Sequence, residues 1–155
     1  MAWQNLLLRK SKVRETNTSI IKTNWSDHSD EITRIRDLVF IQEQNVSKAI
    51  EMDGKDAECI HFLISRKNDY IGTARLKLSG KIERVSILGS YRRKGLGSQL
   101  MKFIIKTSKK LKLNNLYLHS QMESIEFYEQ LGFIKKGDVF IEAGINHIFM
   151  ELYDE

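Results

Sequence analysis

Residues Arg92 to Gly97 read Arg-Arg-Lys-Gly-Leu-Gly, and they stand between an apolar segment, Ile82 to Leu88, and a strongly helical segment, Leu96 to Leu111. Glycines let the backbone turn sharply and come close to a ligand. The first N–H groups of a helix have no partner within the helix, and its positive dipole end favours a phosphate. Strand, glycine loop and helix therefore predict an anion-binding site at the carboxyl end of the strand, as in other α/β folds.

The spacing of this loop excludes two familiar phosphate-binding motifs. A Walker A loop requires Gly-x-x-x-x-Gly-Lys-Ser/Thr, and a dinucleotide-binding fingerprint requires a third small residue where Leu100 stands. The pattern that remains is Arg-x-x-Gly-x-Gly.

A second informative segment runs from Gln121 to Phe133. Ile125, Tyr128 and Leu131 recur at helical spacing on one face, and Gly132 can end the helix in a left-handed conformation. Most apolar residues of this segment are expected in the core. The Tyr128 hydroxyl is different, because it is a hydrogen-bond donor placed beside the predicted phosphate site.

In their order and spacing these two segments resemble the GNAT N-acetyltransferase superfamily. The loop resembles its coenzyme A pyrophosphate loop, and residues 121–133 are similar to its Asn-x-x-Ala-x-x-Phe-Tyr-x-x-x-Gly-Phe signature, with Gln121 and Ser124 in place of asparagine and alanine. Over roughly residues 19 to 152 the chain resembles the ElaA-like branch. The landmarks are Val39-Phe40-Ile41-x-Glu43-Gln44, Glu51-x-Asp53-x-x-Asp56, His61, Gly72-Thr-Ala-Arg75-Leu76 and Phe140-x-Glu142-x-Gly144-Ile145-x-His147. That branch usually has prolines that this chain lacks.

The resemblance implies acetyl-CoA as co-substrate and a set of residues that bind it. These are the backbone of Val85, Ser86 and Ile87, the loop residues Arg92, Arg93, Lys94, Gly95, Leu96, Gly97 and Ser98, and Gln121, Ser124 and Tyr128. It also implies that Tyr128 protonates the departing thiolate.

The general base is less clearly indicated. An ammonium must lose its proton to a carboxylate or an imidazole before it attacks. Glu43, His61 and His147 are the first candidates because they belong to the branch pattern, and Glu83 and Glu142 are further ones. Each also has a structural reading: Glu83 as a solvent-facing strand residue, the histidines as hydrogen-bonded residues, and Glu43 as an anchor after a helix.

Charge is sorted along the chain, although the net charge is only +5. Residues 81–112 contain ten basic residues and one acidic residue, and residues 25–61 contain nine acidic and four basic residues. The basic part matches the phosphates of coenzyme A, because such a field concentrates the matching ion. The acidic part suggests a cationic amine as acceptor, with Glu51, Asp53 and Glu142 as its binding residues.

Length and composition indicate one compact domain. We expect an N-terminal arm at residues 1–18 and the N-acetyltransferase domain at residues 19–155, with no linker dividing the 155 residues. The first residues lack a membrane-length apolar run and a secretory cleavage pattern, which favours a cytoplasmic chain that does not bind membranes. The single cysteine, Cys59, excludes an intrachain disulfide, cannot alone form a zinc site, and is expected to be a buried thiol. No metal is expected.

The expected fold is α/β (α+β), a GNAT-like mixed and mostly antiparallel sheet of six to seven strands flanked by about four helices. Periodicity predicts strands at residues 19–23, 60–66, 70–78, 81–88, 116–119, 133–139 and 147–152, and helices at 30–42, 96–111 and 121–131, with an irregular acidic loop after the first helix. The exposed edge of the final strand could pair in a homodimer.

Three functional classes fit the sequence. The first is an N-acetyltransferase that transfers the acetyl group directly to a primary amine of a small molecule or peptide. A catalytically silent acyl-CoA-binding sensor is the second, and Tyr128 argues against it, because a binder needs no acid for a thiolate. The third is a basic nucleic-acid-binding domain, suggested by Lys102, Lys106, Lys109, Lys110 and Lys112; it lacks interleaved aromatic residues and a groove-reading motif, so no nucleic-acid partner is expected.

Overall fold

The computed structural model describes residues 17–152. Its strands are β1 (Thr18–Thr23), β2 (Ile60–Arg66), β3 (Asp69–Leu76), β4 (Lys81–Ile87), β5 (Tyr117–Gln121), β6 (Phe133–Glu142) and β7 (Ile145–Leu152), and its helices are α2 (Trp25–Arg36), α3 (Lys48–Glu51), α4 (Leu96–Lys110) and α5 (Ile125–Gln130). The arm predicted for residues 1–18 lies outside the described residues except for Asn17 and Thr18, and Thr18 already belongs to β1.

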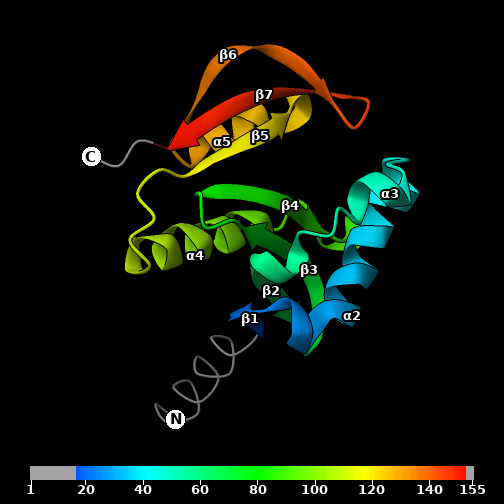
Figure 1. Ribbon diagram of the computed structural model, residues 1–155. Coiled ribbons are helices and arrows are strands. Elements are labelled where there is room, and N and C mark those ends of the chain that lie inside the picture. Colours follow the sequence, from blue (N-terminus) through cyan, green and yellow to red (C-terminus); the bar gives the residue numbers. More distant parts are fainter. Residues whose placement is uncertain (1–16, 153–155) are drawn as a thin grey trace, which may run out of the picture.

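The strands form one seven-stranded sheet in the order β1-β2-β3-β4-β5-β7-β6. Every neighbouring pair is antiparallel except β4 and β5, which run parallel. This confirms the mixed, mostly antiparallel sheet predicted from the sequence. In Figure 1, β5, β7 and β6 with α5 form an upper layer that diverges from the lower part with β1–β4, α2 and α4.

Helices pack on both faces of the sheet because side chains alternate along each strand. On β2, Phe62 and Ile64 join the cluster that contains Leu100 and Ile104 of α4. Leu63, between them, packs instead with Ile32 and Ile35 of α2. The sheet is therefore covered by α4 on one face and by α2 on the other.

The first helix differs from its prediction at both ends. It begins at Trp25, because the Asn24 side chain accepts a hydrogen bond from the backbone N–H of Asp27 and caps the helix. After Arg36 the chain continues as a π-helix, Asp37–Glu43. The irregular acidic loop that was expected next contains α3 and a 3₁₀ turn at Asp56–Glu58.

Two predictions near the C-terminus were also wrong in detail. The helix expected over residues 121–131 is a 3₁₀ turn, Met122–Ser124, followed by the short α5. The final strand, β7, is not an edge strand, because it lies between β5 and β6. The edge strands of the sheet are β1 and β6, and on β6 the side chains of Ile134, Val139 and Ile141 are exposed.

Candidate active site

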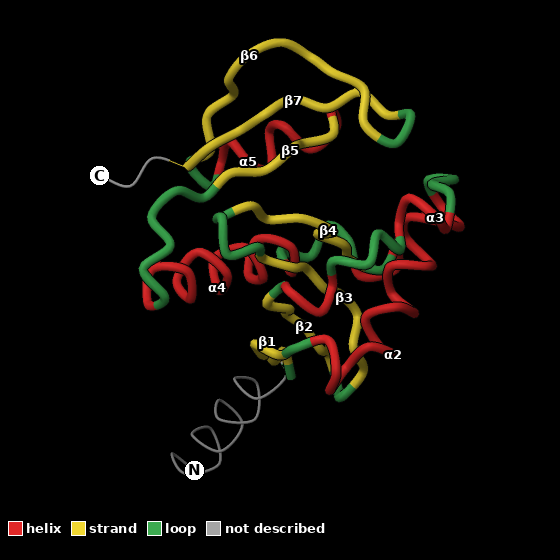
Figure 2. Tube along the Cα trace, viewed as in Figure 1, coloured by secondary structure: helices red, strands yellow, loops and turns green. Residues whose placement is uncertain are grey.

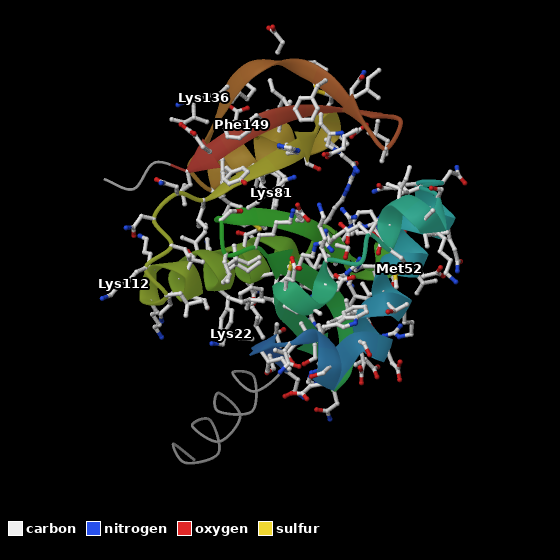
Figure 3. All side chains as sticks on the ribbon, in the orientation of Figure 1. Lys22, Met52, Lys81, Lys112, Lys136 and Phe149 are labelled. Carbon is white, nitrogen blue, oxygen red and sulfur yellow. The ribbon has the colours of Figure 1, made fainter. Side chains whose placement is uncertain are left out.

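The central feature of the site is the divergence of β4 from β5. The two strands are paired at only two positions, Lys81 with Tyr117 and Ile82 with Leu118. Beyond them β5 pairs only with β7, and the tube in Figure 2 shows the two strands separating. A cavity of about 630 Å³ lies in this opening and is lined by residues from β4, β5, the π-helix segment, and the β6–β7 turn. Figure 3 shows side chains of the two parts of the sheet projecting into the space between them.

A β-bulge in β4 changes the direction of the strand at the cavity. Thr73 is paired with Ser86 and Arg75 with Glu83, so Arg84 and Val85 together stand opposite one residue of β3. Arg84 has a left-handed backbone, with φ of 57°. Such a bulge bends a strand and increases its twist, which accounts for the loss of pairing with β5.

The backbone of β4 presents a donor to the cavity, as the family resemblance implies. The N–H of Leu88 donates to the carbonyl of Ile71 at 2.8 Å, so alternate residues of β4 bond toward β3. Ile87, one position earlier, therefore directs its N–H into the opening. Ser86 has the opposite orientation, and its side chain donates to the Thr73 carbonyl at 3.4 Å. Val85 lines the cavity from within the bulge.

The glycine loop forms the N-terminus of α4. Gly95 caps the helix with φ of 77°, and the first backbone bond of the helix runs from the N–H of Gln99 to the Gly95 carbonyl. The N–H groups of Leu96, Gly97 and Ser98 thus precede the first helical hydrogen bond. A Cβ on Gly97 would lie 3.4 Å from the Phe127 ring, which shows how closely α4 and α5 approach.

Three basic side chains surround this helix end, but only two are available to an anion. Arg93 and Lys94 are exposed. Arg92 instead donates two hydrogen bonds to the carboxylate of Glu43, at 2.8 and 3.0 Å, and a third to the Ile87 carbonyl at 2.8 Å. Arg92 therefore joins the loop to the π-helix, and the Glu43 carboxylate is held by this pair instead of being free to act as a base.

Tyr128 is placed at the cavity by α5. Its ring packs edge-on against Phe127 and Phe133, with centroid distances of 5.0 and 5.9 Å. Burial raises the pKa of Tyr128, so the phenol keeps its proton at neutral pH. Within residues 17–152 the hydroxyl has no hydrogen-bond partner, and the residue lines the cavity. Its proton is thus available to a ligand.

Gln121 and Ser124, the other predicted coenzyme residues of this segment, line the same cavity. The Gln121 amide donates to the side chain of Gln44 at 2.9 Å. This bond connects the end of β5 to the chain that follows the π-helix.

A histidine and carboxylate cluster forms the wall opposite β4. His119 Nδ1 lies 3.1 Å from Oε1 of Glu142, and His147 Nε2 lies 3.8 Å from its Oε2. All three residues line the cavity. His147 Nδ1 lies 2.7 Å from the Ile145 carbonyl, which can only accept, so this nitrogen carries a hydrogen.

His119 is the functional candidate that sequence reasoning missed. It faces the cavity with Gln121, two positions away on β5. Its ring is held between Phe140 and Phe149, at centroid distances of 4.9 and 6.1 Å. Sequence alone gave no sign of Glu142 as its partner, because 23 residues separate them and only the order β5-β7-β6 brings them together.

His61 lies away from the cavity, contrary to its prediction as a base. It is fully buried, its Nε2 lies 2.8 Å from the Asp56 carbonyl, and its ring lies 5.6 Å from that of Trp25. Burial lowers the pKa of His61, which keeps it neutral. These contacts match the alternative reading of His61 as a hydrogen-bonded structural residue.

The acidic segment that was expected to bind an amine forms ion pairs within the protein. Glu51 is buried, and its two oxygens lie 2.5 Å from Arg36 Nε and 2.7 Å from Arg84 Nε. Asp53 lies 2.6 Å from Arg75 Nη2, and that hydrogen bond lowers the pKa of Asp53 strongly. Both carboxylates are therefore neutralised by arginines of the protein and do not present a free negative charge to an amine.

Glu83 pairs with several cationic side chains of this ion-pair network and is not a solvent-facing residue. Its Oε2 lies 2.5 Å from Arg75 Nη2, and its Oε1 lies 3.2 Å from Lys77 Nζ and 3.1 Å from Lys81 Nζ. Burial alone would raise the pKa of Glu83, but its hydrogen bonds and the charges of Arg75 and Lys81 outweigh burial and lower it to about 2. Glu83 is thus ionised throughout the physiological range.

Among residues 17–152 no three histidine, cysteine, aspartate or glutamate side chains are arranged to hold a metal ion. No helix in this part of the chain is long and apolar enough to cross a membrane.

Comparison with known proteins agrees with this geometry. A family model described as an acetyltransferase (GNAT) domain matches residues 26–153. The protein YyaT of Bacillus subtilis (strain 168) is 37% identical over 126 residues, which are 77% of this chain and 85% of that protein. The crystal structure of Escherichia coli ElaA has a TM-score of 0.78 at 26% identity and covers 87% of this chain and 99% of its own. An acyl-CoA N-acyltransferase from Pseudomonas aeruginosa has a TM-score of 0.76 at 26% identity, with the same coverage of 87% and 99%.

Proposed function

Because this chain belongs to the GNAT acetyltransferase family, we propose that it transfers the acetyl group of acetyl-CoA directly to a primary amine in the opening between β4 and β5. The observation that carries this proposal is the position of Tyr128. Its hydroxyl, which keeps its proton, lines the same cavity as the outward-facing backbone of β4.

The coenzyme end of the cavity fits a pyrophosphate. The free N–H groups of Leu96, Gly97 and Ser98 and the positive end of α4 would hold it, with Arg93 and Lys94 supplying charge. Bound acetyl-CoA supplies the acetyl group as a thioester. The N–H of Ile87, directed into the opening, would donate to the acetyl carbonyl and stabilise the negative charge that develops there.

The proton that leaves with sulfur is assigned to Tyr128. As nitrogen bonds to the acetyl carbon, the carbon–sulfur bond breaks and the sulfur takes up charge. A neutral phenol beside it donates its proton to the thiolate, and solvent can then restore the proton of the tyrosine. Tyr128 is suited to this role because burial keeps it in the acid form.

The proton that the amine loses is assigned to His119. Its Nδ1 is oriented by Glu142, which leaves Nε2 as the nitrogen that can accept a proton. Glu142 stabilises the imidazolium that results. His147 lines the same wall, but its Nδ1 is held by a backbone carbonyl and its Nε2 lies farther from Glu142.

The test is release of free thiol from acetyl-CoA across a panel of amines, amino acids, polyamines, aminoglycosides and N-terminal peptides. His119→Gln and Glu142→Gln should lower turnover at neutral pH and leave acetyl-CoA affinity nearly unchanged. If the protein binds acetyl-CoA but no amine of the panel causes thiol release, it is a sensor. If it does not bind acetyl-CoA, the proposal is refuted. The cytoplasmic location and the homodimer stay predictions.

A further inference from the structure

The cavity wall on the β3–β4 side carries a net positive charge, whereas the sequence suggests an acidic region that binds an amine. Four carboxylates in this wall and the network behind it meet five cationic side chains. The carboxylates are Glu51, Asp53, Asp56 and Glu83, and the cations are Arg36, Arg75, Arg84, Lys77 and Lys81. His61 adds no charge, since burial lowers its pKa. One positive charge is left over, and the exposed Lys55, which also lines the cavity, adds another.

The excess positive charge lies at the two lysines that face the cavity. Arg36 and Arg75 are 1% exposed and surrounded by carboxylate oxygens. Lys77 and Lys81 share a single oxygen of Glu83, whose other oxygen is taken by Arg75. Each ammonium group has three donors, so both lysines keep donors for another acceptor. Their side chains are 27% and 17% exposed, and both residues line the cavity.

The opposite wall has the complementary chemistry. Glu142 and His119 stand across the opening from β4, where an amine can be bound and deprotonated. Lys81 is paired with Tyr117, two residues before His119 on the same face of the sheet. Strand spacing and rise place the Cα atoms of Lys81 and His119 about 8 Å apart. A molecule of amino-acid size can reach both walls.

Resting on the proposed function, we propose that the acceptor is a small primary amine that also carries an anionic group, a carboxylate or a phosphate, which Lys77 and Lys81 bind. The amine faces His119 and Glu142, and the anion completes the hydrogen bonds of the lysines. A polyamine would place its second cation against the two lysines and is disfavoured by repulsion.

Matched acceptor pairs that differ only in the anionic group test this inference. One pair is β-alanine and 3-aminopropanamide, another is O-phosphoethanolamine and ethanolamine, and 1,4-diaminobutane is the cationic comparison for 4-aminobutanoate. We expect kcat/KM, measured by thiol release, to be at least tenfold higher for the anionic member of one pair. The pair that shows the preference distinguishes a carboxylate from a phosphate.

The double variant Lys77→Gln, Lys81→Gln should reduce that preference at least fivefold, chiefly through KM. Glu83 keeps Arg75 as its partner in this variant, so the fold should persist. The control double variant Lys102→Gln, Lys106→Gln removes an equal charge from exposed positions of α4 that do not line the cavity, and it should leave the preference unchanged.

Two results would overturn the inference while leaving the proposed function intact. One is equal or better use of the neutral or cationic member of each pair. The other is that other amines support thiol release and none of the anionic acceptors does. A preference that survives in the double variant would also overturn the assignment to these lysines. Loss of acetyl-CoA binding by the wild-type protein is a different result, which refutes the proposed function itself.

Discussion

Glu83→Gln should destabilise the protein by an amount that depends on pH. The pKa of Glu83 is about 2 in the folded protein and 4.5 for the ordinary carboxyl. At about 1.36 kcal/mol per unit, that difference corresponds to roughly 3 kcal/mol at neutral pH. Because the folded pKa is depressed, this stabilisation is fully present above about pH 4.5 and is lost as pH falls through 2. Linkage predicts that less than about half of this stabilisation remains at pH 3.

The assay is urea unfolding of wild type and Glu83→Gln at pH 7, 4.5 and 3. The difference in unfolding free energy should be about 3 kcal/mol at pH 7 and at most about half of that at pH 3. Glu129→Gln, at an exposed position of α5, is the control and should change stability by less than about 0.5 kcal/mol. A difference that stays constant from pH 7 to pH 3 would refute the reasoning, because it would show that the loss comes from packing and not from the charge of Glu83.

Three further predictions concern the coenzyme end of the site. Tyr128→Phe should lower turnover by roughly one to three orders of magnitude and change acetyl-CoA affinity by less than about threefold, as measured by steady-state kinetics and calorimetry; unchanged turnover would leave water as the proton source. Gly95→Val should abolish the rise in Tm that acetyl-CoA causes, whereas Gly137→Val, at a similar positive φ in β6, should cost comparable stability and keep that rise; equal ligand-induced shifts would refute the loop assignment. Arg93→Glu should weaken acetyl-CoA binding, and wild-type affinity should fall as salt rises; an affinity equal to wild type would remove this arginine from the phosphate site.

Local sequence signals were sufficient for the elements that form the proposed coenzyme end of the site. The strand at residues 81–88, the glycine loop and the long helix are adjacent in sequence, and each has its own periodicity or turn residue. The phosphate site follows from the helix N-terminus alone, which needs no distant contact. The strands of the sheet were predicted at close to their observed positions for the same reason.

The acceptor end could not be predicted, because its charges pair across long sequence separations. Arg36 meets Glu51 across 15 residues, and Arg84 meets the same carboxylate across 33. A count of charges along the chain assigned the acidic segment to a cationic ligand. In the folded chain those acids satisfy buried arginines, since a buried charge requires a partner. The acceptor that we propose would meet the remaining positive charge of Lys77 and Lys81.

The proposed base, His119, was missed for a related reason. His119 occurs in the sequence as an isolated polar residue of a strand, and nothing local indicates that it faces the cavity beside a carboxylate. In the sheet β7 lies between β5 and β6, and only this strand order brings Glu142 of β6 within hydrogen-bonding distance of His119 on β5. The pairing of His119 with Glu142 therefore depends on the sheet topology, which the family resemblance implied only at the level of the fold.

The bulge in β4 links the two ends of the site. In a regular strand Arg84 would share the face of Ile82, which packs in the core cluster with α4. The left-handed φ of Arg84 costs a non-glycine residue about 1 kcal/mol. The bulge instead turns Arg84 toward the face of the sheet that carries Glu83. There its Nε lies 2.7 Å from the Glu51 carboxylate and its Nη2 lies 3.2 Å from the Glu51 carbonyl, and these contacts offset the cost. The same bend parts β4 from β5. One local distortion thus opens the cavity and joins β4 to α3 through Glu51, so the proposed coenzyme and acceptor regions cannot be altered independently at this residue.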